Sequence, residues 1–130
     1  MIAESTRAAT AEEYTELREV AGMGVAPVAT ARIGLAGTLH AVWLRDEGGA
    51  LVAMGRLIGD GGCFAQVTDI AVRPDLQRRG LGTQVMTGLM TWARANLPTG
   101  CYVSLIADPG AEHLYAKFGF TSRHGMSITI

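Results

Sequence analysis

The residues best suited to binding a ligand form a glycine-containing loop, Gln77-Arg78-Arg79-Gly80-Leu81-Gly82, between an expected strand and an expected helix. The first turn of a helix has unpaired N–H groups and the positive end of the helix dipole, so it attracts anions. Gly80 and Gly82 carry no Cβ that would hold a phosphate away from the backbone. Arg78 and Arg79 add positive charge. Taken alone, the loop fits either a phosphate site or a plain connection with two solvated arginines.

The same loop differs from two common nucleotide-binding motifs. A P-loop ends in Gly-Lys-Ser/Thr, and the pair Gly82-Thr83 has no lysine between its members. A dinucleotide-binding loop has a third glycine, where this chain has Val85, and an acidic residue about 20 positions later. No Asp or Glu occurs between Leu76 and Ala107. This acid-free stretch argues against a dinucleotide site and suits a ligand that carries a pyrophosphate.

Periodicity and turn residues predict the elements that position this loop. The sequence Thr10-Ala-Glu-Glu13 is typical of a capping box, which predicts a helix that ends near Gly22 and Gly24. The segment 25–38 fits a weak helix or a mobile loop. The other expected elements are a short strand at 4–8, strands at 39–45, 50–58 and 63–72, a helix from 82 to Pro98, a strand at 100–107, a helix at 109–118 and a hairpin at 120–130. This order predicts one α+β domain over residues 1–130, with a mixed, mostly antiparallel sheet flanked by helices.

Composition narrows the class of protein. The chain has 130 residues, 48% of them hydrophobic and 18% charged, which is enough to build a core in a single domain. Its formal net charge of −1 argues against binding nucleic acid or anionic lipid through bulk positive charge. Cys63 and Cys101 are too few for a disulfide scaffold and have no zinc-type spacing, so we expect a cytoplasmic protein without a metal site. We find no apolar run of membrane-spanning length and no signal-peptide pattern.

Two motifs together resemble the GNAT superfamily of N-acetyltransferases. The first is Gln77-x-x-Gly80-x-Gly82, which follows the expected strand Thr68-Asp-Ile-Ala-Val72 with Pro74 between them. It resembles the acyl-CoA signature Q/R-x-x-G-x-G/A. The second motif is the run Ala111-x-x-Leu-Tyr-x-Lys-x-Gly-Phe120, which resembles a downstream block of the same family. The resemblance extends over about residues 38–130.

The resemblance implies an enzyme that transfers an acetyl group from acetyl-CoA, as cosubstrate, directly to a primary amine. The pantetheine arm would pair with the strand that precedes the loop, which requires that strands 63–72 and 100–107 separate, with a bulge near Asp69 as a hypothesis. The cofactor-binding residues implied are Ile70, Ala71, Val72, Gln77, Arg78, Arg79, Gly80, Leu81, Gly82, Thr83, Asp108 and Lys117. Many members have Asn where this chain has Asp108, and an ionised Asp accepts hydrogen bonds but cannot donate them.

The resemblance also suggests catalytic residues. Tyr115 matches the family tyrosine whose phenol can donate to the departing CoA thiolate. Asp69 is the candidate general base, against two alternatives: a carboxylate satisfied by nearby backbone, or proton loss through a water chain. His40, His113 and His124 have a suitable intrinsic pKa, but no pattern directs them to the site.

The acceptor is left open by the sequence. Family members build this pocket from segments that correspond to residues 20–40 and 121–127, and the acceptor classes include small amines, amino acids, antibiotics and protein amines. The acidic first helix fits a solvated face or an attraction for a cationic amine. The alternatives to an enzyme are a non-catalytic acyl-CoA-binding module and an interaction domain that needs a partner. A homodimer through the edge of the C-terminal hairpin is also compatible with the sequence.

Overall fold

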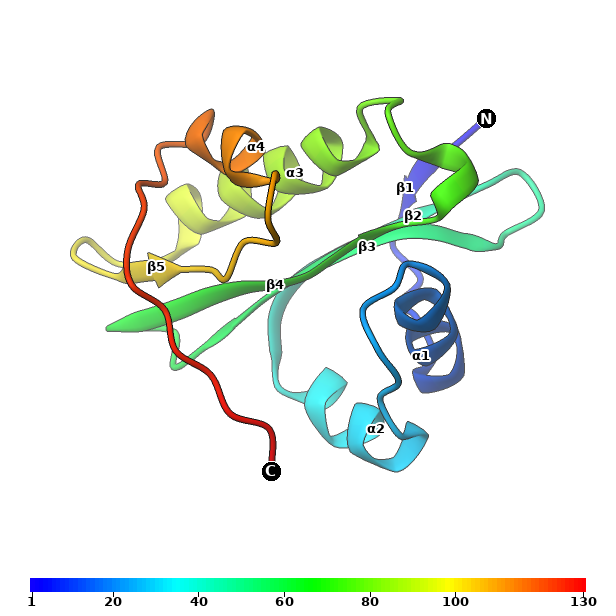
Figure 1. Ribbon diagram of the computed structural model, residues 1–130, viewed down its shortest axis with the longest axis horizontal. Helices are drawn as coiled ribbons and strands as arrows, with labels where there is room; N and C mark the ends of the chain where they lie inside the picture. Colours follow the sequence, from blue (N-terminus) through cyan, green and yellow to red (C-terminus); the bar gives the residue numbers. More distant parts are fainter.

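The computed structural model describes all residues, 1–130, and places two helices on each face of a twisted five-stranded sheet (Figure 1). The strand order is β1-β2-β3-β4-β5; the first four strands are antiparallel to their neighbours and β5 is parallel to β4. The elements are β1 (Ala3–Ser5), α1 (Ala11–Val20), α2 (Val28–Ala36), β2 (Thr38–Arg45), β3 (Leu51–Gly59), β4 (Phe64–Val72), a 3-10 turn (Pro74–Leu76), α3 (Leu81–Asn96), β5 (Tyr102–Ser104) and α4 (Glu112–Ala116). The expected α+β class and mostly antiparallel sheet are confirmed.

The N-terminal helix begins at the expected capping box. The Glu13 N–H donates to Thr10 Oγ1 at 3.1 Å, and the Thr10 N–H donates to Glu13 Oε1 at 3.0 Å. Glu13 also accepts from the buried Arg45 of β2 at 2.6 Å, and these hydrogen bonds lower its pKa to about 2. Three glutamates of α1 are paired with arginines in this way: Glu12 with Arg32, Glu13 with Arg45 and Glu16 with Arg73. These acidic side chains therefore attach α1 to α2, to β2 and to the residue that follows β4.

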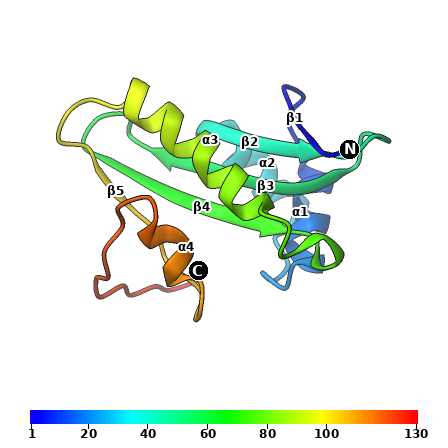
Figure 2. The same cartoon turned by 90° about the horizontal axis from the view of Figure 1, so that it is seen from above.

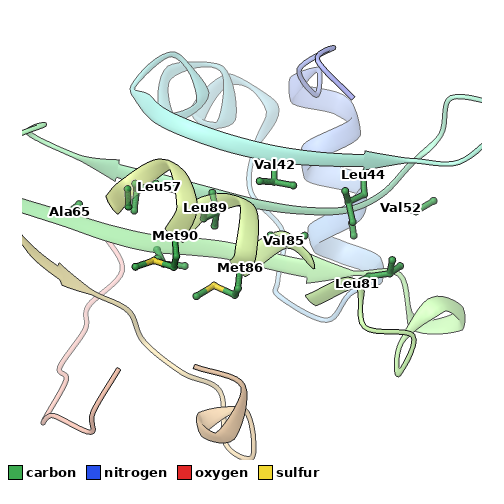
Figure 3. Packing of buried hydrophobic residues seen from close by; sticks show 13 residues of the cluster. Val42, Leu44, Val52, Leu57, Ala65, Leu81, Val85, Met86, Leu89 and Met90 are labelled. Carbon is green, nitrogen blue, oxygen red and sulfur yellow. The ribbon is translucent and has the colours of Figure 1, made fainter. Parts of the chain in front are cut away.

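Each face of the sheet has its own apolar core. The amphipathic helix α3 packs its stripe of Leu81, Val85, Leu89 and neighbouring methionines against β2, β3 and β4 (Figure 3). On the opposite face, α1 and α2 bury Leu17 and Ala31 against the other side of the same strands. Residues Val28–Ala36 of the ambiguous segment 25–38 therefore form a helix, α2, which packs on this face. No helix of the chain is long and apolar enough to span a bilayer.

The C-terminal third differs from the expected elements. The strand expected at 100–107 is reduced to Tyr102–Ser104, and the helix expected at 109–118 is reduced to Glu112–Ala116. The hairpin expected over 120–130 is wrong: residues 120–130 contain no strand, and residues 121–130 are all exposed. An alternating apolar pattern favours a strand, but a strand forms only where another backbone edge pairs with it.

A glycine in β3 permits the close packing of α3 on the sheet. A Cβ added at Gly55 would overlap Val85 Cγ1 and lie 2.6 Å from Ile70 Cδ1. We therefore expect Gly55→Ala to lower the free energy of unfolding by about 1–3 kcal/mol, because an extra methyl overfills a packed core. Gly34→Ala in α2 is the matched control: its Cβ would meet nothing within 4 Å, so that change should be neutral or stabilising. Urea denaturation measures both; an equal effect at both sites would contradict the packing role.

Candidate functional site

The strands β4 and β5 separate in the middle of the sheet. They are paired only where Phe64, Ala65 and Gln66 face Tyr102, Val103 and Ser104. Beyond this point the second half of β4 has no strand on its β5 side. Figure 2 shows the two strands diverging, with α4 near the gap between them. The separation expected between these two segments is therefore confirmed. It leaves a strand edge where an extended ligand can add its own amides.

A bulge bends β4 at the same place. Met54 of β3 faces Ala71, and Arg56 faces Thr68, so Asp69 and Ile70 together oppose Gly55 alone. Asp69 has a φ of 60°, in the left-handed region that Asp and Asn tolerate better than most residues. The bulge hypothesis is confirmed, and its extra residue is the aspartate that the sequence singled out.

Asp69 points into a buried polar cluster on the α1 side of the sheet. The side chain is 3% exposed, and its Oδ2 accepts from the Tyr14 hydroxyl and from Arg56 Nη1, both at 2.7 Å. Its Oδ1 accepts from Arg18 Nη1 at 2.5 Å. Burial and the hydrogen bond to Asp69 raise the pKa of Tyr14, which keeps its phenol in the donating form. Both carboxylate oxygens of Asp69 are therefore occupied.

The two arginines extend this cluster to the α1–α2 segment. Arg18 Nη2 donates to the Met23 carbonyl at 2.8 Å, and Arg56 Nη2 donates to the Gly34 carbonyl at 2.8 Å. Asp69 thus connects the bulge to the loop after α1 and to the last turn of α2. Sequence reasoning did not single out Arg18 or Arg56; the one available signal was that Tyr14 and Arg18 lie four residues apart on one helix face.

The glycine-containing loop presents a row of free backbone donors. The N–H groups of residues 78–83 donate no hydrogen bond within the chain. Arg78 and Gly80 have φ values of 66° and 78°, and Gly80 is the N-cap of α3. The side chains of Arg78 and Arg79 are exposed and take part in no salt bridge. Successive free N–H groups at a left-handed turn and a helix start form a concave anion site.

The short helix α4 borders this loop. A Cβ added at Gly82 would lie 3.7 Å from Leu114 Cδ2, which places the residue before Tyr115 against the first turn of α3. Tyr115 is half-buried and packs edge-on against Phe120, with ring centroids 6.4 Å apart. Burial, and then the Asp108 carboxylate, raise the pKa of the Tyr115 phenol. The phenol therefore stays protonated at neutral pH.

Other predicted site residues lie at the edges of this region. Asp108 and Lys117 are exposed before and after α4, and Gln77 turns its side-chain amide 3.4 Å from the Val72 carbonyl at the end of β4. Of the three histidines, His113 lies on α4 and His124 lines the same hollow as Tyr115. His40 stacks flat on Trp92, with centroids 4.9 Å apart, and burial lowers its pKa. The chain holds no group of three or more side chains arranged to bind a metal ion.

A wide hollow adjoins Tyr115. It has a volume of about 810 Å³ and is open to solvent. Its walls are β5 with the residues that follow it, α4, and the C-terminal segment 118–127, which includes Arg123 and His124. Tyr115 therefore lies in the wall of this hollow, next in the chain to Leu114, which contacts the first turn of α3.

A family model and a solved structure similar to this chain are both described as acetyltransferases. Residues 6–120 match the model described as the acetyltransferase (GNAT) family. The crystal structure of a protein of unknown function from meticillin-resistant Staphylococcus aureus, described as a probable acetyltransferase, is 38% identical, with a TM-score of 0.93 and coverage of 100% of both chains.

Two curated relatives match over shorter stretches. An uncharacterized N-acetyltransferase from Pyropia yezoensis is 29% identical over 112 residues, which is 83% of this chain and 63% of that protein. The chloroplastic serotonin N-acetyltransferase 2 of Oryza sativa subsp. japonica is 36% identical over 83 residues, 61% of this chain and 40% of that protein. The chain thus spans less than two thirds of the length of these curated relatives.

Proposed function

Because the chain belongs to the GNAT family of acetyltransferases, we propose that it transfers an acetyl group from acetyl-CoA to a primary amine. The observation that carries this proposal is the row of unpartnered N–H groups at residues 78–83 beside the open edge of β4. The open edge of β4 suits an extended arm that carries amides. The free N–H groups, which follow β4 in the chain, suit a pyrophosphate.

The residues present fit acetyl-CoA. The free amides of Arg78, Arg79, Gly80, Leu81, Gly82 and Thr83 would hold the pyrophosphate, with the two unpaired guanidinium groups beside it. Ile70, Ala71 and Val72 would pair with the arm, and Gln77, Asp108 and Lys117 would border it. When bound, the thioester supplies an activated acetyl group. Backbone N–H groups near Ile70–Val72 would polarise its carbonyl.

Tyr115 is the proposed acid. The phenol is protonated at neutral pH and would donate its proton to the sulfur of the leaving thiolate. Its position on α4, next to the helix turn that contacts Gly82, supports this role.

The contacts of Asp69 support a positioning role in place of direct proton removal. Both of its oxygens accept from Tyr14, Arg18 and Arg56, and its side chain is nearly fully buried. A general base needs a free oxygen within reach of the substrate proton. In this proposal Asp69 holds the bulge and the α1–α2 wall in place, and the amine proton leaves through solvent.

The acceptor is a small-molecule or peptide amine that enters beside the α1–α2 segment. Arg18 and Arg56 bond the carbonyls of Met23 and Gly34 and so hold this wall against β4. The rice relative is named for serotonin, which makes arylalkylamines one member of the panel to test. The two free cysteines suit a reducing cytoplasm as the location.

The test combines binding and turnover. Acetyl-CoA should raise the melting temperature, because a ligand that binds only the folded state stabilises it. Acetyl-CoA with an amine panel should then release free thiol; the panel contains serotonin, a simple alkylamine, amino acids, an aminoglycoside and a peptide with a free N-terminus and a lysine. Binding without thiol release for any amine indicates a non-catalytic acyl-CoA-binding module. No thermal shift would overturn the proposal.

The loop arginines give a sharper prediction. We expect the double change Arg78→Ala and Arg79→Ala to raise the Kd for CoA about tenfold, since each removes a charge-assisted contact worth about 1.5–3 kcal/mol, reduced by exposure. Isothermal titration at two salt concentrations should show a weaker salt dependence in the variant. Arg32→Ala on α2 is the control, because Arg32 is also exposed but pairs with Glu12. Equal Kd values for the wild type, the double variant and Arg32→Ala would show that Arg78 and Arg79 do not contribute to CoA binding.

A further inference from the structure

The two cysteines of the chain lie on neighbouring strands, at the end where β4 and β5 are paired. Cys63 and Cys101 each stand one residue before the first register pair of these parallel strands, Phe64 with Tyr102. The Tyr102 N–H donates to the Cys63 carbonyl at 2.8 Å, so the two backbones are already joined at this position. The fold thus brings together two thiols that are far apart in the chain.

Both thiols belong to the same face of the sheet. Side chains alternate along a strand, so each cysteine shares a face with the residue two positions later. Those residues are Ala65 and Val103, and both pack in the core beneath α3. Cys101 packs against the same core. The alternation therefore places the thiols of Cys63 and Cys101 together on the α3 side of the sheet.

The spacing of adjacent strands suits a disulfide. Neighbouring strands lie about 4.7–4.9 Å apart, and the Cα atoms that a disulfide joins are usually about 4.4–6.8 Å apart. Each cysteine also follows a loop with a glycine in the left-handed region, Gly61 at a φ of 77° and Gly100 at a φ of 91°. Small changes in these loops can bring the two Cβ atoms closer without moving the strands.

The two thiols differ in their access to solvent. Cys63 is exposed, whereas Cys101 is half-buried in a shallow groove that Leu97 and Pro98 also line. An exposed thiol meets a soluble reagent first, and a neighbouring thiol can then resolve the mixed disulfide that forms. Cys63 is therefore suited to the first step and Cys101 to the second.

We propose that Cys63 and Cys101 are a reversible modification site that reacts with low-molecular-weight disulfides. The Cys63 thiolate attacks one sulfur of the reagent, forms a mixed disulfide and expels one thiolate. The Cys101 thiolate then attacks the Cys63 sulfur, forms the Cys63–Cys101 bond and expels the second thiolate. The two cysteines are oxidised, the reagent is reduced to two thiols, and these take up the two protons.

The bond closes a covalent ring around the candidate cofactor-binding segment. Residues 63–101 include the open edge of β4, the loop of free amides and the whole of α3. A cross-link of this kind restricts mainly the unfolded chain and so stabilises the folded one. A reducing compartment keeps such a pair as thiols, so the bond forms there only during an oxidising shift. Its formation is independent of any acetyl transfer.

Oxidised glutathione is the probe, and intact mass and melting temperature are the readouts. Folded wild-type protein should lose the mass of two hydrogen atoms and retain no glutathione, and a peptide map should join Cys63 to Cys101. The melting temperature should rise by roughly 5 °C or more and return to its first value after reduction with dithiothreitol. Cys101→Ser should stop at one glutathione on Cys63, without this rise.

Cys63→Ser combined with Phe64→Cys is the matched control. It moves the thiol by one residue to the opposite face, at a position that is also exposed. This variant should keep glutathione and form no internal bond. A wild-type chain that stays reduced, retains glutathione or forms disulfides only between two chains overturns the proposal. So does an internal bond that fails to raise the melting temperature or forms equally well in the control. None of these measurements involves acetyl-CoA, so a failure here is distinct from a failure of the proposed activity.

Discussion

Replacement of Tyr115 by phenylalanine is expected to lower kcat by about 100-fold or more while the Kd for CoA stays unchanged. General acid catalysis contributes about 10²–10⁴-fold to a rate, and the change removes only the hydroxyl that would donate to the leaving thiolate. The ring, and with it the edge-on packing against Phe120, is kept. The effect should therefore fall on turnover and leave binding and folding intact.

Kinetics of thiol release and isothermal titration with CoA separate these quantities. Tyr102→Phe is the matched control, since it removes a hydroxyl from an exposed tyrosine of β5. We expect wild-type turnover from that variant. An unchanged kcat in Tyr115→Phe would leave Tyr115 with a packing role only, and a raised Kd with unchanged kcat would make it a binding residue.

Asp69→Asn should lower the free energy of unfolding by about 3–5 kcal/mol. The change leaves the buried Arg56 and the part-buried Arg18 without their counter-charge, and an uncompensated buried charge carries a penalty of this size. Asparagine has nearly the same shape and also tolerates the φ of 60° at the bulge. The variant therefore isolates the charge from the backbone conformation.

Chemical denaturation of three variants tests this expectation. Tyr14→Phe removes one neutral donor from the same carboxylate and should cost about 1 kcal/mol. Asp75→Asn, at an exposed position outside every salt bridge, should cost nothing measurable. If Asp69→Asn instead keeps full stability and loses turnover, Asp69 is the general base and the positioning role is wrong.

Local patterns predicted much of the fold. The capping box at Thr10 and Glu13, the apolar stripe of α3 and the three meander strands depend on residues close in sequence. The loop of residues 77–82 was recognisable for the same reason, because its anion site consists of consecutive backbone N–H groups. The bulge at Asp69 was also foreseen, but only through the resemblance to a family.

Long-range contacts were not predictable in this way. Asp69 finds Arg18 and Arg56 at separations of 51 and 13 residues, and no short pattern links them. Nothing in the residues next to Gly55 indicates that Val85 of α3 packs against it. The alternation in residues 126–130 predicted a strand that the structure does not contain, because pairing depends on a neighbouring backbone edge that the pattern does not specify.

The sequence by itself therefore determined the family, the α+β class and the glycine-containing loop of residues 77–82, since each depends on neighbouring residues or on their fixed spacing. The tertiary structure alone decided how the carboxylate of Asp69 is used, which strand edges stay open and where Tyr115 lies relative to the loop. Those properties arise from side chains and backbone edges that meet only after the sheet and its two helical layers have packed together.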